Sequence, residues 1–237
     1  MDQRSSTREA FQARSQALLQ IWLSPAFPVG AFAYSHGLEA AADRGWVADR
    51  TSLEPWLADL VSAGALRNDL ILLAAAWRAA SSFDLARLQE IADLGAALQP
   101  SAERFLEATQ QGRSFLQQIA AAWPAPDPDA LMAPLDCEDV IHSVAVGVAA
   151  SLHDIPLADT LRAYAMAFAG NMTSAAIRLS IIGPTESQQI MAALMPLLLA
   201  QATAAETATL DDLGSATMLS DLASLFHETQ NTRLFRS

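Results

Sequence analysis

Residues 51–61 read Thr-Ser-Leu-Glu-Pro-Trp-Leu-Ala-Asp-Leu-Val, with apolar side chains recurring mainly three or four positions apart. This spacing places the apolar side chains on one face of an α-helix. Thr51-Ser52-Leu53-Glu54 fits a capping box, in which two side chains satisfy the free amides of a helix's first turn. The stretch therefore predicts a helix that begins at Thr51 and buries Leu53, Trp56, Leu57, Leu60 and Val61.

The same spacing recurs along the rest of the chain, whereas the β-branched alternation of strands is almost absent. Alanine, the strongest helix former, is abundant. The helix that opens at Pro156 is expected to run to Ile182, because Gly183-Pro184 stops a helix. Further helices are expected to begin near Thr7, Asn68, Ser82, Ser101, Asp136, Thr185 and Leu219.

The length of 237 residues is enough to bury one sizeable core. The sequence predicts a single all-α domain over residues 1–237, a helical bundle of roughly eight to ten helices. Residues 1–6 and about 202–216 are predicted to be mobile. Residues 233–237 are predicted to form a docking tail.

The chain has 14 basic and 26 acidic residues, a formal net charge of −12, and every basic residue is an arginine. The absence of lysine excludes a Schiff-base lysine and a Gly-Lys-Ser/Thr phosphate loop. The acidic balance argues against binding to nucleic acid or to an anionic membrane. A single cysteine, Cys137, excludes intramolecular disulfides and zinc sites built on paired thiolates. A basic protein partner is compatible with this composition.

The best candidate for a membrane span is Ser187–Ala205, which carries no charge but contains three glutamines and Pro196. Its apolar part, Ile190–Ala200, covers only about half of the roughly 20 residues that a bilayer requires. The N-terminus does not fit a signal peptide. We therefore expect a soluble, cytoplasmic protein.

Two pairs of side chains are candidate metal ligands. His36 and Glu39 are three positions apart, and Glu138 and His142 are four apart, so a helix would place each pair on one face. A metal site usually needs a third and a fourth ligand. We therefore predict no metal site, no cofactor and no catalytic residue. A helical metal-binding protein or metalloenzyme using both pairs is the alternative, and an unrelated helical adaptor is a further one.

Two segments are unusually apolar for their positions. Residues 24–39 join two predicted helices, yet they are aromatic, small and turn-forming where a loop is normally polar. At the C-terminus, Leu234 and Phe235 stand between Arg233 and Arg236. Aromatic and arginine side chains dominate interface hot spots. The segment 24–39 is therefore either a buried crossover between two helices or a surface for a partner, and the tail suggests docking into another protein.

The run Phe27-Pro-Val-Gly-Ala-Phe-Ala-Tyr-Ser-His-Gly-Leu-Glu39 resembles the signature of the urease accessory protein UreF family. The ending His227-Glu-Thr-Gln-Asn-Thr-Arg-Leu-Phe-Arg-Ser237 is similar to that family's C-terminal motif. The likeness extends from about Leu18 over nearly the whole chain. One stretch departs from the family pattern Gly-Gln-Thr-x-x-Gln, because the first glutamine is replaced by Pro184. A role of that glutamine therefore does not carry over.

The resemblance implies an all-helical, non-enzymatic scaffold that dimerises, binds UreD (also called UreH) and recruits the GTPase UreG to apo-urease. It also implies that the protein modulates GTP-dependent nickel insertion. We expect the tail to become ordered against UreD, and the segment 27–39 to form the opposite surface, which receives UreG. The predicted partner-binding residues are Tyr34, Ser35, His36, Glu39, His227, Glu228, Arg233, Leu234, Phe235, Arg236 and Ser237.

Overall fold

The computed structural model describes residues 3–124 and 139–237, with side chains from residue 9 onward. The predicted all-α fold in a single helical domain is confirmed, and these two ranges contain no strand. The elements in chain order are α1 (Gln3–Trp22), η1 (Ala31–Ala33), α2 (Leu38–Asp43), α3 (Arg50–Ala63), α4 (Ala65–Ser81), α5 (Leu85–Ala97), α6 (Ala102–Ala122), α8 (His142–Leu152), α9 (Leu157–Arg178), α10 (Pro184–Ala205), η2 (Leu210–Asp212) and α11 (Met218–His227).

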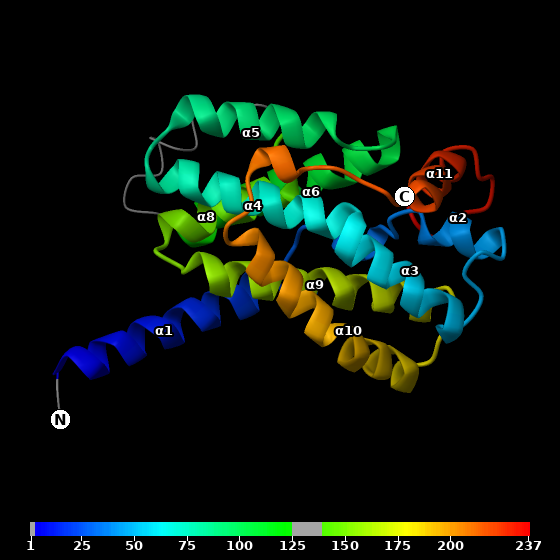
Figure 1. Ribbon diagram of the computed structural model, residues 1–237, viewed down its shortest axis with the longest axis horizontal. Coiled ribbons are helices and arrows are strands. Elements are labelled where there is room, and N and C mark those ends of the chain that lie inside the picture. Colours follow the sequence, from blue (N-terminus) through cyan, green and yellow to red (C-terminus); the bar gives the residue numbers. More distant parts are fainter. Residues whose placement is uncertain (1–2, 125–138) are drawn as a thin grey trace.

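Helix α4 lies at the centre of the bundle, where it packs against α3, α5, α8, α9 and α10 (Figure 1). Its side chains Leu70, Leu73 and Ala74 are fully buried. Helix α8 is buried on all sides from Ser143 to Ala150, as expected of a helix that is apolar all round. The α4–α8 pair is therefore the core on which the other helices pack.

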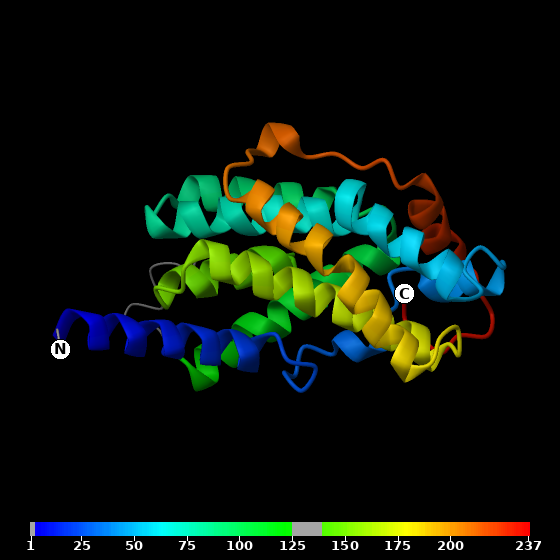
Figure 2. The same cartoon turned by 60° about the horizontal axis from the view of Figure 1, so that its bottom comes forward.

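The two ends of the bundle differ in construction. Helix α1 extends beyond the other helices at the N-terminal end, whereas the C-terminus lies beside α2 and α11 at the opposite end (Figures 1 and 2). Helix α11 packs against α2 and α6. The segment that follows α1 therefore runs towards the end of the bundle where the chain also finishes.

Helices α4 and α8 approach so closely that only glycine fits at one point of contact. A Cβ atom at Gly147 in α8 would lie 2.4 Å from the backbone oxygen of Leu73 in α4. No Cβ atom sits that close to a carbonyl oxygen without backbone movement. The close approach of the two core helices therefore depends on Gly147.

Helix α3 begins one residue before the predicted start. Its N-cap is Asp49, whose Oδ1 accepts the backbone N–H of Ser52 at 2.9 Å, while Ser52 Oγ accepts the backbone N–H of Asp49 at 3.1 Å. The capping box therefore lies two residues before the one predicted at Thr51. The carboxylate of Asp49 accepts the free N–H of the first turn and so takes the place predicted for the Thr51 hydroxyl. The predicted stripe is buried except for the half-buried Trp56.

Three other helix starts were predicted from Ser or Asn residues. Asn68 lies inside α4, which begins at Ala65, so the prediction of a start there is wrong. Helix α5 is capped by Asp84, whose Oδ1 accepts the N–H of Arg87 at 3.0 Å, and not by Ser82. Helix α6 begins directly after Ser101, as predicted. Asp84 therefore replaces Ser82 as the cap of α5, whereas α4 begins after Gly64 without a side-chain cap.

Helix α9 begins after Pro156 as predicted but ends at Arg178, before Ile182. Helix α10 begins at Pro184, not at Thr185, and Glu186 accepts the N–H of Gly183 at 2.9 Å. Proline is favoured at the first helical position because its missing N–H would have no partner there. Pro184, which departs from the family pattern, is therefore compatible with the start of α10.

The helices predicted near the two ends of the chain are present as α1 and α11. The helix predicted to begin at Asp136 begins instead at His142, with Ile141 as its N-cap, so that prediction is wrong; Asp136 itself lies outside the described residues. The segment after α10 has several partners: Arg78 Nη2 donates to the backbone oxygen of Glu206 at 2.6 Å, and the N–H of Ala216 donates to the oxygen of Ala63 at 2.8 Å. The mobility of residues 1–6 and 202–216 stays a prediction.

By length and composition, the described ranges contain one stretch able to cross a membrane, Arg50–Ser81. It comprises α3 and α4, and 56% of its most apolar window is buried inside the bundle. The core helices of a globular protein pass the same test. The stretch Ser187–Ala205, which the sequence singled out, does not pass it.

Replacing Gly147 by alanine should destabilise the protein by about 1–3 kcal/mol, because the added methyl group forces α4 and α8 apart. The matched control is Gly170→Ala in α9, where a Cβ atom meets nothing within 4 Å. That change should stabilise the protein by up to about 1 kcal/mol through helix propensity. Urea titration of both variants measures the two changes. Equal stabilities of the two variants would contradict the role given to Gly147.

Candidate functional site

The segment 31–39 and the C-terminal tail (residues 233–237) lie side by side. The N–H of Ser35 donates to the backbone oxygen of Ser237 at 2.8 Å, and the N–H of Arg236 donates to the oxygen of Ala33 at 2.8 Å. The backbone at His36 (φ 56°) and Gly37 (φ 75°) is left-handed, and these turns lead from the extended residues into α2. Two motifs at opposite ends of the sequence therefore form one site.

Glu39 in α2 holds the backbone of the tail. Its Oε1 accepts the N–H of Leu234 at 2.6 Å, and its Oε2 accepts the N–H of Phe235 at 2.8 Å. The same Oε2 lies 3.1 Å from Nε2 of His227. The Glu39 side chain is almost fully buried, so it needs these donors in place of water.

His227, the last residue of α11, is completely buried between two carboxylates. Its Nε2 faces Glu39, and its Nδ1 lies 2.6 Å from Oε2 of Glu103 in α6. The other oxygen of Glu103 forms an ion pair with Arg233 of the tail. Because a carboxylate only accepts hydrogen bonds, both contacts of His227 are made when both ring nitrogens carry a proton.

Glu107, one turn further along α6, is the second anchor of the tail. Its Oε2 accepts the Ser237 hydroxyl at 2.5 Å and pairs with Arg104, while its Oε1 lies 2.7 Å from His36 Nδ1. Although burial by itself raises the pKa of Glu107, the charges of Arg104 and His36 outweigh it and hold that pKa well below its ordinary value. Glu107 is therefore ionised at neutral pH.

The ring of His36 has two neighbours that compete for one nitrogen. Its Nδ1 lies 2.7 Å from Glu107 and 2.8 Å from Nη1 of Arg104. The nitrogen donates to Glu107 when it carries a proton and accepts from Arg104 when it does not. Either state keeps His36 beside the anchor of the tail.

Two side chains of the tail, Phe235 and Ser237, are buried, and the other three are exposed. Phe235 is 3% exposed, and the guanidinium of Arg178 lies 4.2 Å from the centre of its ring, a cation–π contact. Leu234 is 55% exposed, and Arg233 and Arg236 are also exposed. The tail therefore presents an apolar side chain between two arginines to solvent.

The prediction that the segment 27–39 and the tail form opposite surfaces is wrong, because they hydrogen-bond to each other. Of the predicted partner-binding residues, three have exposed side chains and two, His36 and Glu228, are half-buried. Glu228 accepts the N–H of Ala102 at the start of α6 at 2.8 Å. The remaining side chains are buried within the chain: Tyr34, Ser35, Glu39, His227, Phe235 and Ser237.

The candidate metal pair His36 and Glu39 does not assemble. His36 precedes α2 and turns to Glu107, whereas Glu39 turns to His227 and the tail. Glu138 lies outside the described residues. Among the residues that the structure describes, no group of three or more His, Cys, Asp or Glu side chains is arranged to hold a metal ion.

Three charged residues of α6 that complete this site were not predicted from the sequence: Glu103, Arg104 and Glu107. They share one face of the helix by their spacing, which was the signal available. Such a charged face normally lies in solvent, whereas Arg104 and Glu107 are buried here. Their partners, His227 and the tail, lie more than a hundred positions away in the sequence.

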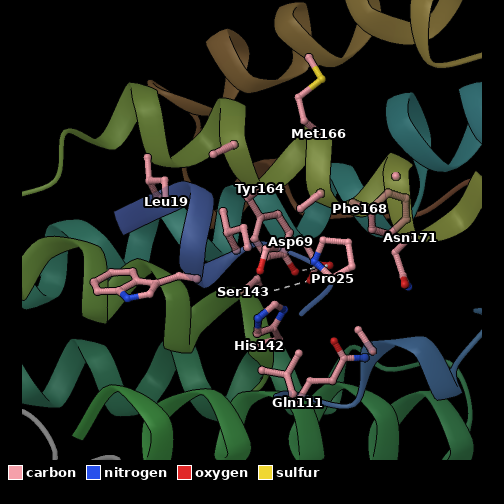
Figure 3. Close-up of a pocket in the computed structure, with 18 of the residues that line it drawn as sticks. Leu19, Pro25, Asp69, Gln111, His142, Ser143, Tyr164, Met166, Phe168 and Asn171 are labelled. Carbon is pink, nitrogen blue, oxygen red and sulfur yellow. Dashed lines mark hydrogen bonds between the residues drawn. The ribbon is translucent and has the colours of Figure 1, made fainter. Parts of the chain in front are cut away.

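A cavity of about 860 Å³ adjoins this site between α1, α6, α8 and α9 (Figure 3). Ser143 and Tyr164 donate hydrogen bonds to the two oxygens of Asp69 at 3.0 and 3.2 Å. Burial raises the pKa of Asp69 and lowers the pKa of His142 to about 4. The Nε2 atom of His142 is buried and has no hydrogen-bond partner. The cavity therefore combines apolar walls with a small polar cluster.

The rim of the cavity includes exposed apolar side chains. Phe32, in η1, is 70% exposed, and Leu199, on α10, is 39% exposed. The backbone oxygen of Phe32 accepts a hydrogen bond from Arg178, the same residue that stacks on Phe235 of the tail. The rim and the tail are therefore linked through one arginine.

Residues 47–195 match the protein-family model described as UreF. The chain belongs to the UreF family. It is 50% identical over 244 aligned residues to the urease accessory protein UreF of Xanthobacter autotrophicus, with 100% of both chains covered. It is 50% identical to the UreF of Azorhizobium caulinodans, covering 94% of this chain and 96% of that one. The UreF of Rhodopseudomonas palustris is 48% identical, with 96% and 93% covered.

The full-length relatives cover both motifs of the site, which lie outside residues 47–195. All three of these UreF proteins are named urease accessory proteins. An accessory protein of this family is a chaperone rather than an enzyme, and the same holds for this chain. The resemblance noted from the sequence is therefore confirmed at the level of the family.

His142 should make the protein sensitive to acid. Between pH 6.5 and about 4, the unfolded chain binds a proton at His142 that the folded chain does not bind. Stability should therefore fall as the pH drops through this window, by about 3 kcal/mol in total from this group. The variant His142→Phe should lose that part of the fall, which thermal unfolding across this pH range measures.

The matched variant His153→Phe removes a second buried histidine, whose pKa is also lowered, chiefly by burial. It should reduce the acid sensitivity by less than His142→Phe does. An acid profile of His142→Phe that coincides with that of the unchanged protein would contradict the assignment of a neutral, buried His142.

Proposed function

We propose that this chain is a scaffold for UreD and the GTPase UreG on apo-urease, and that it modulates GTP-dependent nickel insertion in the cytoplasm. Family membership supports a role in urease maturation. The absence of lysine, and with it of a Gly-Lys-Ser/Thr phosphate loop, is consistent with a regulator that leaves nucleotide chemistry to its partner. The observation that carries the proposal is the single site formed by the two family motifs.

For UreD, the proposed contact is the set of apolar side chains exposed at this end of the bundle. Helix α11 turns small or polar side chains inward and large apolar ones outward, the reverse of an ordinary surface helix. Exposed apolar patches of this kind mark protein interfaces. The set consists of Leu234 in the tail and Met218, Leu219, Leu222, Leu225 and Phe226 in α11.

For UreG, the proposed site is the segment Tyr34–Glu39 together with the tail that it holds. The hydroxyl of Tyr34 donates to Oε1 of Gln110 at 2.5 Å, and Glu39 binds the tail. These buried groups set the position of the exposed arginines Arg233 and Arg236. The segment therefore acts on UreG by fixing which side chains of the tail face outward.

We also propose that the chain forms a homodimer in which a second copy covers the cavity. Phe32 is the most exposed aromatic side chain at the cavity rim, and an aromatic ring at such a position is typical of an interface. In a two-fold symmetric dimer, the same surface of each copy faces the other. The mixed apolar and polar lining would then be closed off from solvent.

Leu234→Asp should weaken the complex with UreD at least tenfold while leaving the fold intact, because the Leu234 side chain is exposed and only its backbone N–H contacts Glu39. Burying a leucine contributes roughly 1.5–3 kcal/mol, which corresponds to a tenfold or greater loss in affinity. The chain, UreD and UreG are mixed and the complex is measured by size-exclusion chromatography. Phe83→Asp is the matched control, since Phe83 is 60% exposed in the loop before α5. Unchanged elution of the Leu234→Asp mixture would refute the docking proposal.

Phe32→Asp should shift the protein from dimer to monomer, because the two-fold contact would bury a charge against an apolar surface. Sedimentation velocity at several protein concentrations measures the change. The control is again Phe83→Asp, whose side chain does not line the cavity. A dimer that survives Phe32→Asp with undiminished affinity would place the contact elsewhere.

A further inference from the structure

The cavity between α1, α6, α8 and α9 contains a carboxylate without a counter-ion. Asp69, on α4, accepts hydrogen bonds from the hydroxyls of Ser143 and Tyr164 at 3.0 and 3.2 Å, and both donors are uncharged (Figure 3). Among the residues that the structure describes, no arginine or histidine forms an ion pair with Asp69. Two neutral donors offset only part of the cost of removing a charge from water.

The two arginines that line the same cavity are already paired. Arg104 forms an ion pair with Glu107 in α6. Arg162 lies 3.2 Å from Asp159, three positions earlier in α9. With histidines counted as neutral, the described lining holds three carboxylates and two arginines, a formal charge of −1. Burial raises the pKa of Asp69, and the charges around it do not cancel this effect. A cation placed beside Asp69 would do so.

A second polar group in the cavity also lacks a partner. Nε2 of His142 is buried and makes no hydrogen bond within the part of the chain that the structure describes. The imidazole ring lies 5.6 Å from the ring of Tyr164, whose hydroxyl binds Asp69, so both groups adjoin the same tyrosine. Because burial lowers the pKa of His142 to about 4, the ring is neutral at neutral pH. It therefore does not supply the missing positive charge.

Most of the remaining wall is apolar. A volume of about 860 Å³ is typical of a site for a small organic molecule, since such pockets measure about 300–1,000 Å³. A hydrated metal ion would leave the apolar walls facing water, whereas a hydrocarbon body would cover them. The walls and Asp69 together therefore fit an occupant with an apolar body and one positive group. The apolar wall includes Leu19, Trp22, Leu23, Val29, Met166 and Phe168.

We propose that this cavity is a binding site for a small organic ammonium ion: its N–H groups bind Asp69, and its hydrocarbon part lies against the apolar wall. Charge-assisted hydrogen bonds of this kind are stronger than those of the two hydroxyls. The ammonium group cannot come from a second copy of this chain, because the chain has no lysine. The site is separate from the surfaces proposed for UreD and UreG, so it does not depend on the scaffold function.

Isothermal titration calorimetry of the full-length chain at neutral pH tests the role of charge. The probes are hexylamine, 1-hexanol and hexanoate, which have alkyl chains of similar size and differ in the charge of the end group. Hexylamine should bind at least about tenfold more tightly than 1-hexanol, because a hydrogen bond between charged groups adds about this much affinity. Hexanoate should bind most weakly, since its charge repels Asp69. Equal affinities for hexylamine and 1-hexanol, or no binding of hexylamine at millimolar concentration, would overturn the proposal.

The length of the hydrocarbon part gives a second readout. From propylamine to hexylamine, affinity should rise about fourfold for each added methylene group, as expected of burial against apolar walls. An affinity that does not depend on chain length would overturn the proposal. Capped lysine, with an acetyl and a methylamide group, carries the same ammonium on a peptide backbone. Binding as tight as that of butylamine would identify a protein side chain as the source of the ammonium, and much weaker binding would identify a free amine.

Two substitutions assign the charge preference to one carboxylate. Asp69→Asn keeps the size of the side chain and should remove the preference for hexylamine over 1-hexanol. Asp159→Asn is the matched control, because Asp159 also lines the cavity but is paired with Arg162; it should keep the preference. A preference that persists in Asp69→Asn would overturn the proposal. Should that variant fail to fold, the probe series on the unchanged chain still decides the question. UreD and UreG are absent from every assay, so a failure here is separate from a failure of the scaffold function.

Discussion

Three carboxylates that lie on two helices determine how the C-terminal end of this protein is built. Glu39 and Glu107 are buried, and Glu103 is nearly so. A charge removed from water costs several kcal/mol unless donors replace the water. These donors come from Arg104 of α6 and from His227, and from the tail through Arg233, Ser237 and two backbone amides. The tail therefore supplies hydrogen-bond donors to the buried carboxylates of the two helices, and the same hydrogen bonds fix the position of the tail.

The sequence was sufficient to predict the fold class because helix formation is local. The apolar spacing in residues 51–61 and the caps at Ser101 and Pro156 identify helices without knowledge of their neighbours. Errors arose where two nearby residues offered a cap. Asp49 and Asp84 have stronger acceptors than the Thr51 and Ser82 that were chosen. Such competition depends on the backbone geometry, which a one-dimensional pattern does not contain.

The candidate site was recognised only as two separate segments. Their apolar character and their family resemblance were visible, but nothing local indicates that Ser35 bonds to Ser237 across the length of the chain. The charged face of α6 was missed for a related reason. Glu103, Arg104 and Glu107 have the spacing of an ordinary solvent-exposed face, and only the packing of α11 and the tail buries them. The pairing of charged residues that lie far apart in the sequence is therefore visible only in the structure.

Helix α11 carries both the apolar face proposed for UreD and the buried His227, which contacts Glu39 and Glu103. A surface helix normally gains its stability by burying large apolar side chains, but α11 buries Ala223, Ser224 and His227 and exposes its larger ones. Hydrophobic burial within the chain therefore holds α11 less strongly than it holds an ordinary surface helix, although Phe226 packs on Trp46 and Arg44. The contacts of His227 with Glu39 and Glu103 supply what is missing. Because the same contacts position the tail, weakening them loosens α11 and the tail together, and a partner that covers the apolar face of α11 would stabilise both.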